Sequence, residues 1–176
     1  CITEVRVEQF LDRPAQFALR FQEDYNEDGE PRIVDADELA PERIITIAVE
    51  VEDGMKCLIR GPITEVKSSF APGGPGSWFE ARGVDRRVEM SRVCHRRAWV
   101  GRASGAAQSI FSSYGFGTDI QETNQEYSED SGTLNQRSND LDFINRIARR
   151  NNLSFWISYT CRSGSLNPSG GSLTVE

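Results

Sequence analysis

The amino-acid sequence predicts a mainly β protein of the α+β class, in which a small antiparallel barrel or sandwich precedes helices. About six short segments in the first 85 residues alternate apolar and polar side chains and are separated by turn residues. After residue 100 the apolar residues recur at helical spacing. A second amphipathic helix, beginning near residue 140, leads directly into another alternating segment.

The first two predicted strands form a hairpin. Residues 2–10 and 17–21 both alternate apolar and polar side chains, which indicates two strands with one buried face each. Pro14 lies between them in "LDRPAQ" and favours a turn because its ring fixes φ. An acidic loop is expected over residues 23–42.

Further strands follow this loop. β-branched residues predict a strand over 43–52, and shorter apolar runs predict strands over 57–59, 63–70 and 77–85. The Gly-rich segment "APGGPG" lacks the Gly-Lys-Ser/Thr ending of a phosphate-binding loop, so it predicts a turn.

The first helix is expected in "GRASGAAQSIFSSYG". Its apolar residues have helical spacing, and Gly115 is suited to end the helix in the left-handed conformation. Residues 116–133 are polar, and "NQEYSED" within them predicts a solvated loop.

The clearest helix lies in "SNDLDFINRIARRNNLSFW", residues 138–156. Asn139 is a suitable N-cap, and Asp142 follows at the position of a capping-box acid. Asn151 and Asn152 can end the helix because Asn tolerates left-handed backbone. A strand is expected over 153–159, and residues 173–175 can pair with it. The apolar stripe of the helix is formed by Phe143, Ile144, Ile147 and Ala148.

Composition limits the classes of function. The chain has 176 residues, a net charge of −7 and no apolar run long enough to cross a membrane, and no signal peptide is visible. The acidic balance argues against a general nucleic-acid binder, and no direct nucleic-acid binding or membrane anchor is expected. Because the chain begins with Cys1 rather than Met, we expect the native N-terminus to lie upstream.

The four cysteines do not predict a zinc site, since they are widely spaced and form no Cys-x-x-Cys pair. Cys57 lies in an apolar strand pattern and is interpreted as a small buried hydrophobic residue. Reduced thiols are expected, although the sequence leaves open one disulfide without identifying its partners.

The residues offer little support for catalysis. The single histidine, His95, follows Cys94 directly. Because neighbours on a strand point to opposite faces, these two side chains are not expected to form a catalytic Cys/His pair. We interpret His95 as a solvated or interface residue and the arginine run 92–102 as an interface or linker feature. The acidic pair Asp37-Glu38 is interpreted as solvated. No catalytic residue, cofactor-binding residue or cofactor is therefore expected.

One segment partly matches a calcium-binding loop. It carries oxygen ligands at alternate positions, but its last ligand is Asp rather than Glu, Pro31 replaces an aliphatic residue, and no flanking helices are expected. A solvated acidic loop is favoured, and no metal site is expected. The candidate ligands are Asp24, Asn26, Asp28 and Asp35.

The segment "QRSNDLDFINRIARRNNLSFW" resembles a motif of contractile-injection baseplate hubs, the phage late control protein D group and the VgrG spike proteins. Arg137 matches the Arg of the polar run that opens this motif. Arg149, Arg150 and the Asn pair depart from it, because the family has acidic residues and Gly there. The motif positions that the chain retains, as structural residues, are Asn139, Asp140, Phe143, Arg146, Ile147, Phe155 and Trp156.

Other segments agree with the family in order and spacing. The first hairpin of the family is resembled by "VEQFLDRPAQFALRF". Its Pro-Gly-Gly turn region is resembled by "IRGPITEVKSSFAPGGPGSWFEARGVDRRVEMSR". Its Trp segment and short helix are resembled by "WVGRASGAAQSIFSSYG". The resemblance spans nearly the whole chain, and the order of the motifs is more specific than any one of them.

The resemblance implies a structural hub that joins a sixfold tube to a threefold spike. It implies a tube-like antiparallel β-barrel over 1–100, a helical connector over 101–152 and the first strands of a second, incomplete barrel over 153–176. The expected partners are two further copies in a homotrimer, the tail tube protein, the spike protein and other baseplate proteins. The chain would be made in the cytoplasm and assembled into a virion or injection particle.

Two other functions stay open. A baseplate-associated cell-wall hydrolase would need a carboxylate pair or a metal cluster in a cleft. A monomeric ligand-binding β-barrel would stay a monomer in solution.

Overall fold

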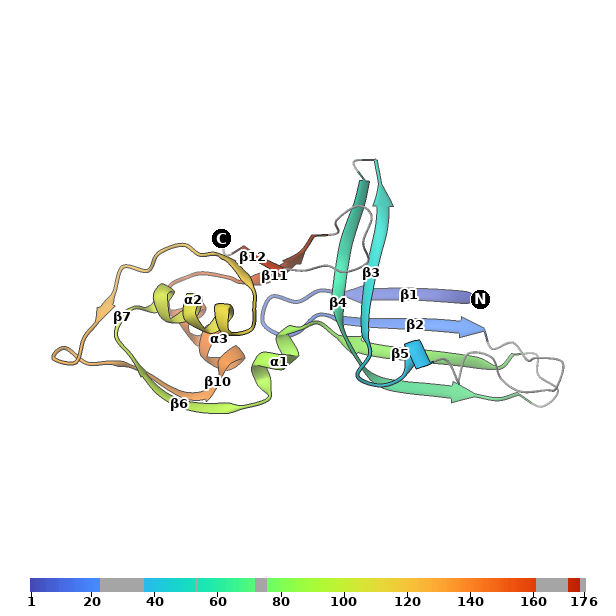
Figure 1. Ribbon diagram of the computed structural model, residues 1–176, viewed down its shortest axis with the longest axis horizontal. Coiled ribbons are helices and arrows are strands. Elements are labelled where there is room, and N and C mark those ends of the chain that lie inside the picture. The colour runs from blue at the N-terminus through green and yellow to red at the C-terminus, as the bar shows by residue number, and fades with distance from the viewer. Residues whose placement is uncertain (23–36, 53, 72–75, 161–170, 175–176) are drawn as a thin grey trace. The chain divides into compact units, whose positions relative to one another are not determined.

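The computed structural model describes residues 1–22, 37–52, 54–71, 76–160 and 171–174, with backbone only for the last four (Figure 1). Strands predominate over helices, so the predicted β-rich α+β class is confirmed. Contacts divide the chain into two compact units. Unit 1 consists of Cys1–Gln9, Pro14–Ala48 and Leu58–Arg86, and unit 2 of Phe10–Arg13, Val49–Cys57 and Arg87–Glu176.

Unit 1 contains most of a five-stranded sheet with the strand order β1-β2-β5-β4-β3, while the end of β3 and the start of β4, within Val49–Cys57, belong to unit 2. Neighbours pair antiparallel from β1 through β2 and β5 to β4. A short 3-10 helix, η1 (Asp37–Leu39), precedes β3. The sheet is curled as a half-barrel (Figure 1). Its strands are β1 (Ile2–Glu8), β2 (Gln16–Gln22), β3 (Ile44–Val51), β4 (Gly54–Ser69) and β5 (Trp78–Val84).

Strand alternation gives this sheet an apolar and a charged face. Leu19 pairs with Ala81 and Phe21 with Phe79, which stacks apolar side chains from neighbouring strands. The opposite face carries cross-strand rows of alternating charge, such as Glu4–Arg20–Glu80–Lys67. This alternation favours the observed register because opposite charges face one another.

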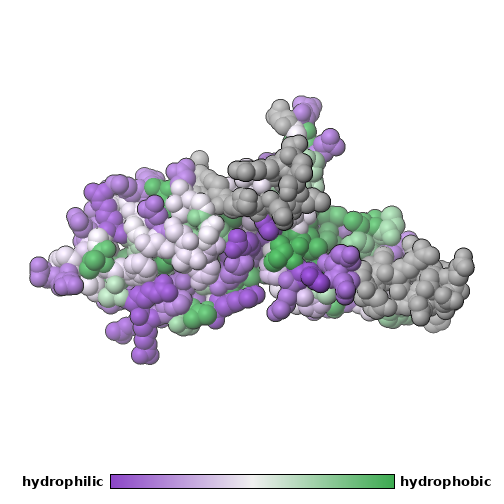
Figure 2. Space-filling view, viewed as in Figure 1, coloured by the Kyte–Doolittle hydropathy of each residue, from purple (hydrophilic) through white to green (hydrophobic). Residues whose placement is uncertain are grey.

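The apolar face of β1 is partly exposed, although Val7 packs against the core of unit 1. Ile2 is 54% exposed and Val5 is 50% exposed. Figure 2 shows hydrophobic surface over the part of unit 1 where β1 lies. β1 and β3 are the two ends of the strand order, so both are edges of the sheet as the described residues form it.

The two strands predicted over 57–59 and 63–70 are wrong as separate elements, because β4 runs through both. Gly61 and Pro62 bend the strand instead of ending it, and the register with β5 is irregular between Ile63 and Glu65. At Gly61 a Cβ would lie 1.8 Å from the carbonyl oxygen of Val84, so only glycine permits this approach to the neighbouring backbone.

In unit 2, short strands surround the two longer helices, α2 and α3. Three small sheets have the orders β10-β6, β11-β12-β8 and β7-β9. The elements are α1 (Arg87–Ser91), β6 (Cys94–Trp99), β7 (Gly101–Arg102), α2 (Ala103–Ser113), β8 (Gly117–Asp119), β9 (Glu126–Tyr127), β10 (Leu134–Asn139), α3 (Asp140–Arg150), β11 (Trp156–Tyr159) and β12 (Gly171–Thr174).

The apolar faces of α2 and α3 supply the core of unit 2. Ile110 and Phe111 from α2 are buried with Phe143 and Ile147 from α3, as the helical spacing predicts. The expected pairing of residues near 173 with the strand before them is confirmed by β11 and β12. Residues 116–133 also contain β8 and β9, and β8 pairs parallel with β12, which the sequence did not predict.

Candidate functional site

The hub-like motif forms the junction between β10 and α3. The side-chain oxygen of Asn139 accepts a hydrogen bond from the backbone N–H of Asp142 at 2.8 Å, which confirms the predicted N-cap. The amide nitrogen of Asn139 donates back to the Asp142 carboxylate at 2.9 Å. The capping acid Asp142 therefore binds the side chain of Asn139. In the usual capping box the acid instead binds the backbone N–H of the N-cap residue.

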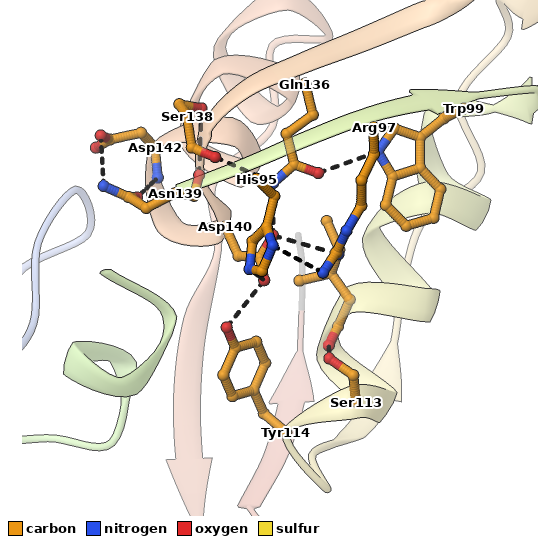
Figure 3. Close-up of polar contacts among 11 residues, drawn as sticks. His95, Arg97, Trp99, Ser113, Tyr114, Gln136, Ser138, Asn139, Asp140 and Asp142 are labelled. Carbon is orange, nitrogen blue, oxygen red and sulfur yellow. Dashed lines mark hydrogen bonds and ion pairs between the residues drawn. The ribbon is translucent and has the colours of Figure 1, made fainter. Parts of the chain in front are cut away.

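Asp140, the first residue of α3, is only 1% exposed. The Tyr114 hydroxyl at the end of α2 donates a hydrogen bond to Asp140 Oδ2 at 2.9 Å, and Gln136 Nε2 in β10 donates to Oδ1 at 2.5 Å. Figure 3 shows these groups converging on the carboxylate. The positive end of the α3 dipole adds further stabilisation of a negative charge at this position.

Two side chains of β6 lie against the buried carboxylate. His95 Nε2 lies 3.4 Å from Asp140 Oδ2, and Arg97 Nη1 lies 3.7 Å from Oδ1 (Figure 3). Arg97 Nη2 is 3.1 Å from His95 Nδ1, and Trp99 Nε1 donates to Gln136 Oε1 at 3.1 Å. A buried carboxylate is tolerated only with such partners, so these side chains hold β6, β10 and α3 together.

Tyr114 is held in its protonated form. Burial, followed by the hydrogen bond to the Asp140 carboxylate, raises the pKa of Tyr114 to about 12. The hydroxyl therefore remains a hydrogen-bond donor at neutral pH. The hydrogen bond between Tyr114 and Asp140 ties the end of α2 to the start of α3.

The other motif residues continue this junction. Phe143 is fully buried and stacks on Trp99, with ring centroids 6.3 Å apart. Arg146 Nη2 donates to the carbonyl of Asn135 at 2.7 Å, which ties α3 to β10. Its guanidinium also lies 5.2 Å from the centre of the Phe143 ring, while Ile147 is buried in the core.

The aromatic pair of the motif lies at the start of the last sheet. Phe155 is buried, and its ring centroid is 5.9 Å from that of Phe111 in α2. Trp156 is half-buried in β11 and pairs with Thr174 of β12. The structure thus places every retained motif residue in unit 2, where each has a packing or hydrogen-bonding role.

The His95 side chain is 24% exposed and lies against the buried carboxylate, a contact that the sequence did not predict. Arg97, Tyr114 and Gln136 also belong to this network, and the sequence did not single them out as members of it. The alternation His95, Arg97, Trp99 along one strand indicates a shared face, but nothing in the sequence reveals the buried acid opposite it.

The remaining candidates are placed as follows. The calcium-loop residues Asp24, Asn26, Asp28 and Asp35 lie outside the described residues. Asp37 and Glu38 are exposed on η1, and Cys57 is buried, as the sequence predicts. In the part of the chain that the structure describes, no three His, Cys, Asp or Glu side chains gather as metal ligands. The helices described there are too short or too polar to cross a membrane.

Comparison with solved structures identifies two proteins with this fold. The E. coli c3393 protein is a component of the type VI secretion system with structural similarity to the T4 bacteriophage tail proteins gp27 and gp5. It aligns with a TM-score of 0.59 and 13% identity over 99% of this chain and 48% of its own. The 43 kDa tail protein of prophage MuSo2 from Shewanella oneidensis gives a TM-score of 0.57 and 12% identity over 97% and 47%.

No protein-family model matches the sequence, and no curated protein matches it. The chain spans about half the length of each of the two solved structures. At these identities the likeness establishes a shared fold, which covers nearly the whole of this chain.

Proposed function

We propose that this chain is a structural component of a phage tail or of a related injection apparatus. The observation that carries the proposal is the shared fold, which extends over 99% of the chain for a type VI secretion component and 97% for a prophage tail protein. The hub-like sequence motif supports the same class of particle independently, because it was identified from residues and their order alone.

Within such a particle, the proposed place is the baseplate hub, where a homotrimer joins the sixfold tube to the threefold spike. Residues 1–100 would contribute a tube-like barrel, residues 101–152 a connector, and residues 153–176 the beginning of a second barrel. The tail tube protein, the spike protein and other baseplate proteins are the proposed partners. The protein would be made in the cytoplasm and assembled into the particle.

The exposed apolar side chains of β1 support assembly with further chains. Ile2 and Val5 occupy an edge strand of a half-barrel, and exposed apolar residues on such an edge favour contact with another protein surface. We propose that a second copy of the chain covers this edge and that its strands contribute to closing the tube.

The proposed role is non-catalytic. Asp140 is enclosed by His95, Arg97, Tyr114 and Gln136, so the most deeply buried acid of the junction is not accessible to a substrate. A cell-wall hydrolase would require an accessible acid with a raised pKa beside a second carboxylate.

Native mass measurement on the full-length protein tests the proposal. We expect a mass three times that of the protomer, and Val5→Glu should shift the population toward monomer because it places a charge in the proposed contact. Val93→Glu introduces the same charge at another exposed valine and should leave the trimer intact. A wild-type protein that remains monomeric at high concentration would contradict the hub and favour the ligand-binding barrel.

A further inference from the structure

The ribbon formed by β6 and β10 has two different faces. Its inner face carries the side chains that surround Asp140. On the outer face, Arg96 and Arg137 are direct cross-strand partners, and both side chains are exposed. Two positive charges are therefore held side by side on the solvent face of a two-stranded sheet.

This pairing carries an electrostatic cost in the isolated chain, because like charges directly opposite each other on a sheet destabilise it. Other arginines nearby are compensated: Arg97 lies 3.7 Å from Asp140, and Arg102 forms an ion pair with Glu122. Among the residues that the structure describes, neither Arg96 nor Arg137 has an acidic partner within ion-pair distance. The positive charges of Arg96 and Arg137 can therefore bind carboxylates that the described residues do not supply.

Aliphatic side chains border the arginine pair. Ala98 is exposed two residues beyond Arg96 on the same face of β6, and Val100, which follows the strand, is 59% exposed. A binding segment that matches this surface would carry acidic groups beside small aliphatic ones. Guanidinium groups suit carboxylates in particular, because their planar fork can donate two parallel hydrogen bonds.

We propose that the outer face of the β6–β10 ribbon is a docking surface for an acidic, aliphatic segment of a partner protein, whose carboxylates lie against Arg96 and Arg137. The inference goes beyond the proposed hub role and does not depend on it. A protein segment is favoured over a nucleic acid because the whole chain has a net charge of −7, which opposes binding of a long polyanion.

The test uses the full-length protein and a fluorescent peptide of alternating Glu and Val, with binding followed by anisotropy. Arg96→Glu should weaken peptide binding by about tenfold or more, because it removes one cation and adds a like charge. The same variant should raise the melting temperature by about 2 °C, because a Glu–Arg pair replaces two opposed arginines. Arg150→Glu is the matched control: it makes the same charge change at the exposed end of α3 and should leave binding unchanged.

Three results would overturn the proposal. The first is an Arg96→Glu variant that binds the peptide within twofold of wild type. The second is a lower melting temperature for this variant, which would assign the arginine a structural role. The third is tighter binding of a single-stranded oligonucleotide of equal charge that is lost in the same variant, which would identify the surface as a phosphate site.

Discussion

At the scale of single residues, the Asp140 carboxylate at the start of α3 contacts side chains of β6, of β10 and of the end of α2. Tyr114 and Gln136 donate hydrogen bonds to it, the Arg97 guanidinium lies 3.7 Å from Oδ1, and the His95 ring lies 3.4 Å from Oδ2. Since nearly all of the group is removed from water, its stabilising effect depends on these partners being present together.

We expect Asp140→Asn to lower the free energy of unfolding by about 2 kcal/mol, because it removes the charge that lies opposite Arg97 and weakens the hydrogen bonds that the carboxylate accepts. Chemical denaturation measures the change. Asp142→Asn is the control, since this exposed residue keeps its capped backbone N–H and should cost about 0.5 kcal/mol. Equal losses for both variants would show that the buried network adds nothing beyond the helix cap.

Tyr114 gives unit 2 a defined response to alkaline pH. Its folded pKa of about 12 lies above the ordinary tyrosine value of 10.0, so its stabilising effect is complete below pH 10 and is lost as the pH rises toward 12. The difference in unfolding free energy between wild type and Tyr114→Phe should therefore shrink over this interval. A difference that stays constant from pH 9 to pH 12 would refute this assignment.

Local residue roles were predictable from the sequence, whereas the network was not. Asn139 caps α3, Gly115 has a φ of +72° after α2, and Asn152 has a φ of +56° after α3, all as their residue types predict. The network joins His95 to Asp140 across 45 positions of sequence. Its members meet because of the register of β6 on β10, which a single sequence does not specify.

At the scale of elements, β4 shows how a proline can mark a bend instead of an end. The pattern predicts a break at Gly61-Pro62, because Pro removes a backbone donor and Gly weakens a strand. The structure retains the strand because Gly61 lets the backbone approach Val84 closely. The parallel pairing of β8 with β12 was also unpredictable, since it joins segments more than 50 residues apart.

A pair of glycine substitutions tests the bend. Gly61→Ala should destabilise the protein by about 2 kcal/mol or more, because its Cβ would meet the Val84 backbone, which cannot move as a side chain can. Gly105→Ala should stabilise it by about 0.5 kcal/mol, because this exposed glycine lies inside α2 with no atom within 4 Å of a new Cβ. Thermal unfolding would compare the two, and equal effects would contradict the close approach.

At the scale of the whole molecule, the strands of unit 1 form an open half-barrel with an exposed apolar edge. A sheet of this kind is completed most simply by strands from a neighbouring chain. The β-rich fold was predictable because period-two patterns and turn residues are local signals. The proposed assembly does not follow from those local signals, because it depends on surfaces that meet only between chains.

A density map of the particle that contains this protein tests the proposed homotrimeric hub between tube and spike. We expect three copies of the chain at the end of the tube, with the β1–β5 sheets placed in the tube wall and the edge strand β1 covered by a neighbouring copy. A map that shows the chain away from the tube–spike junction, or as a single copy with β1 open to solvent, would contradict it.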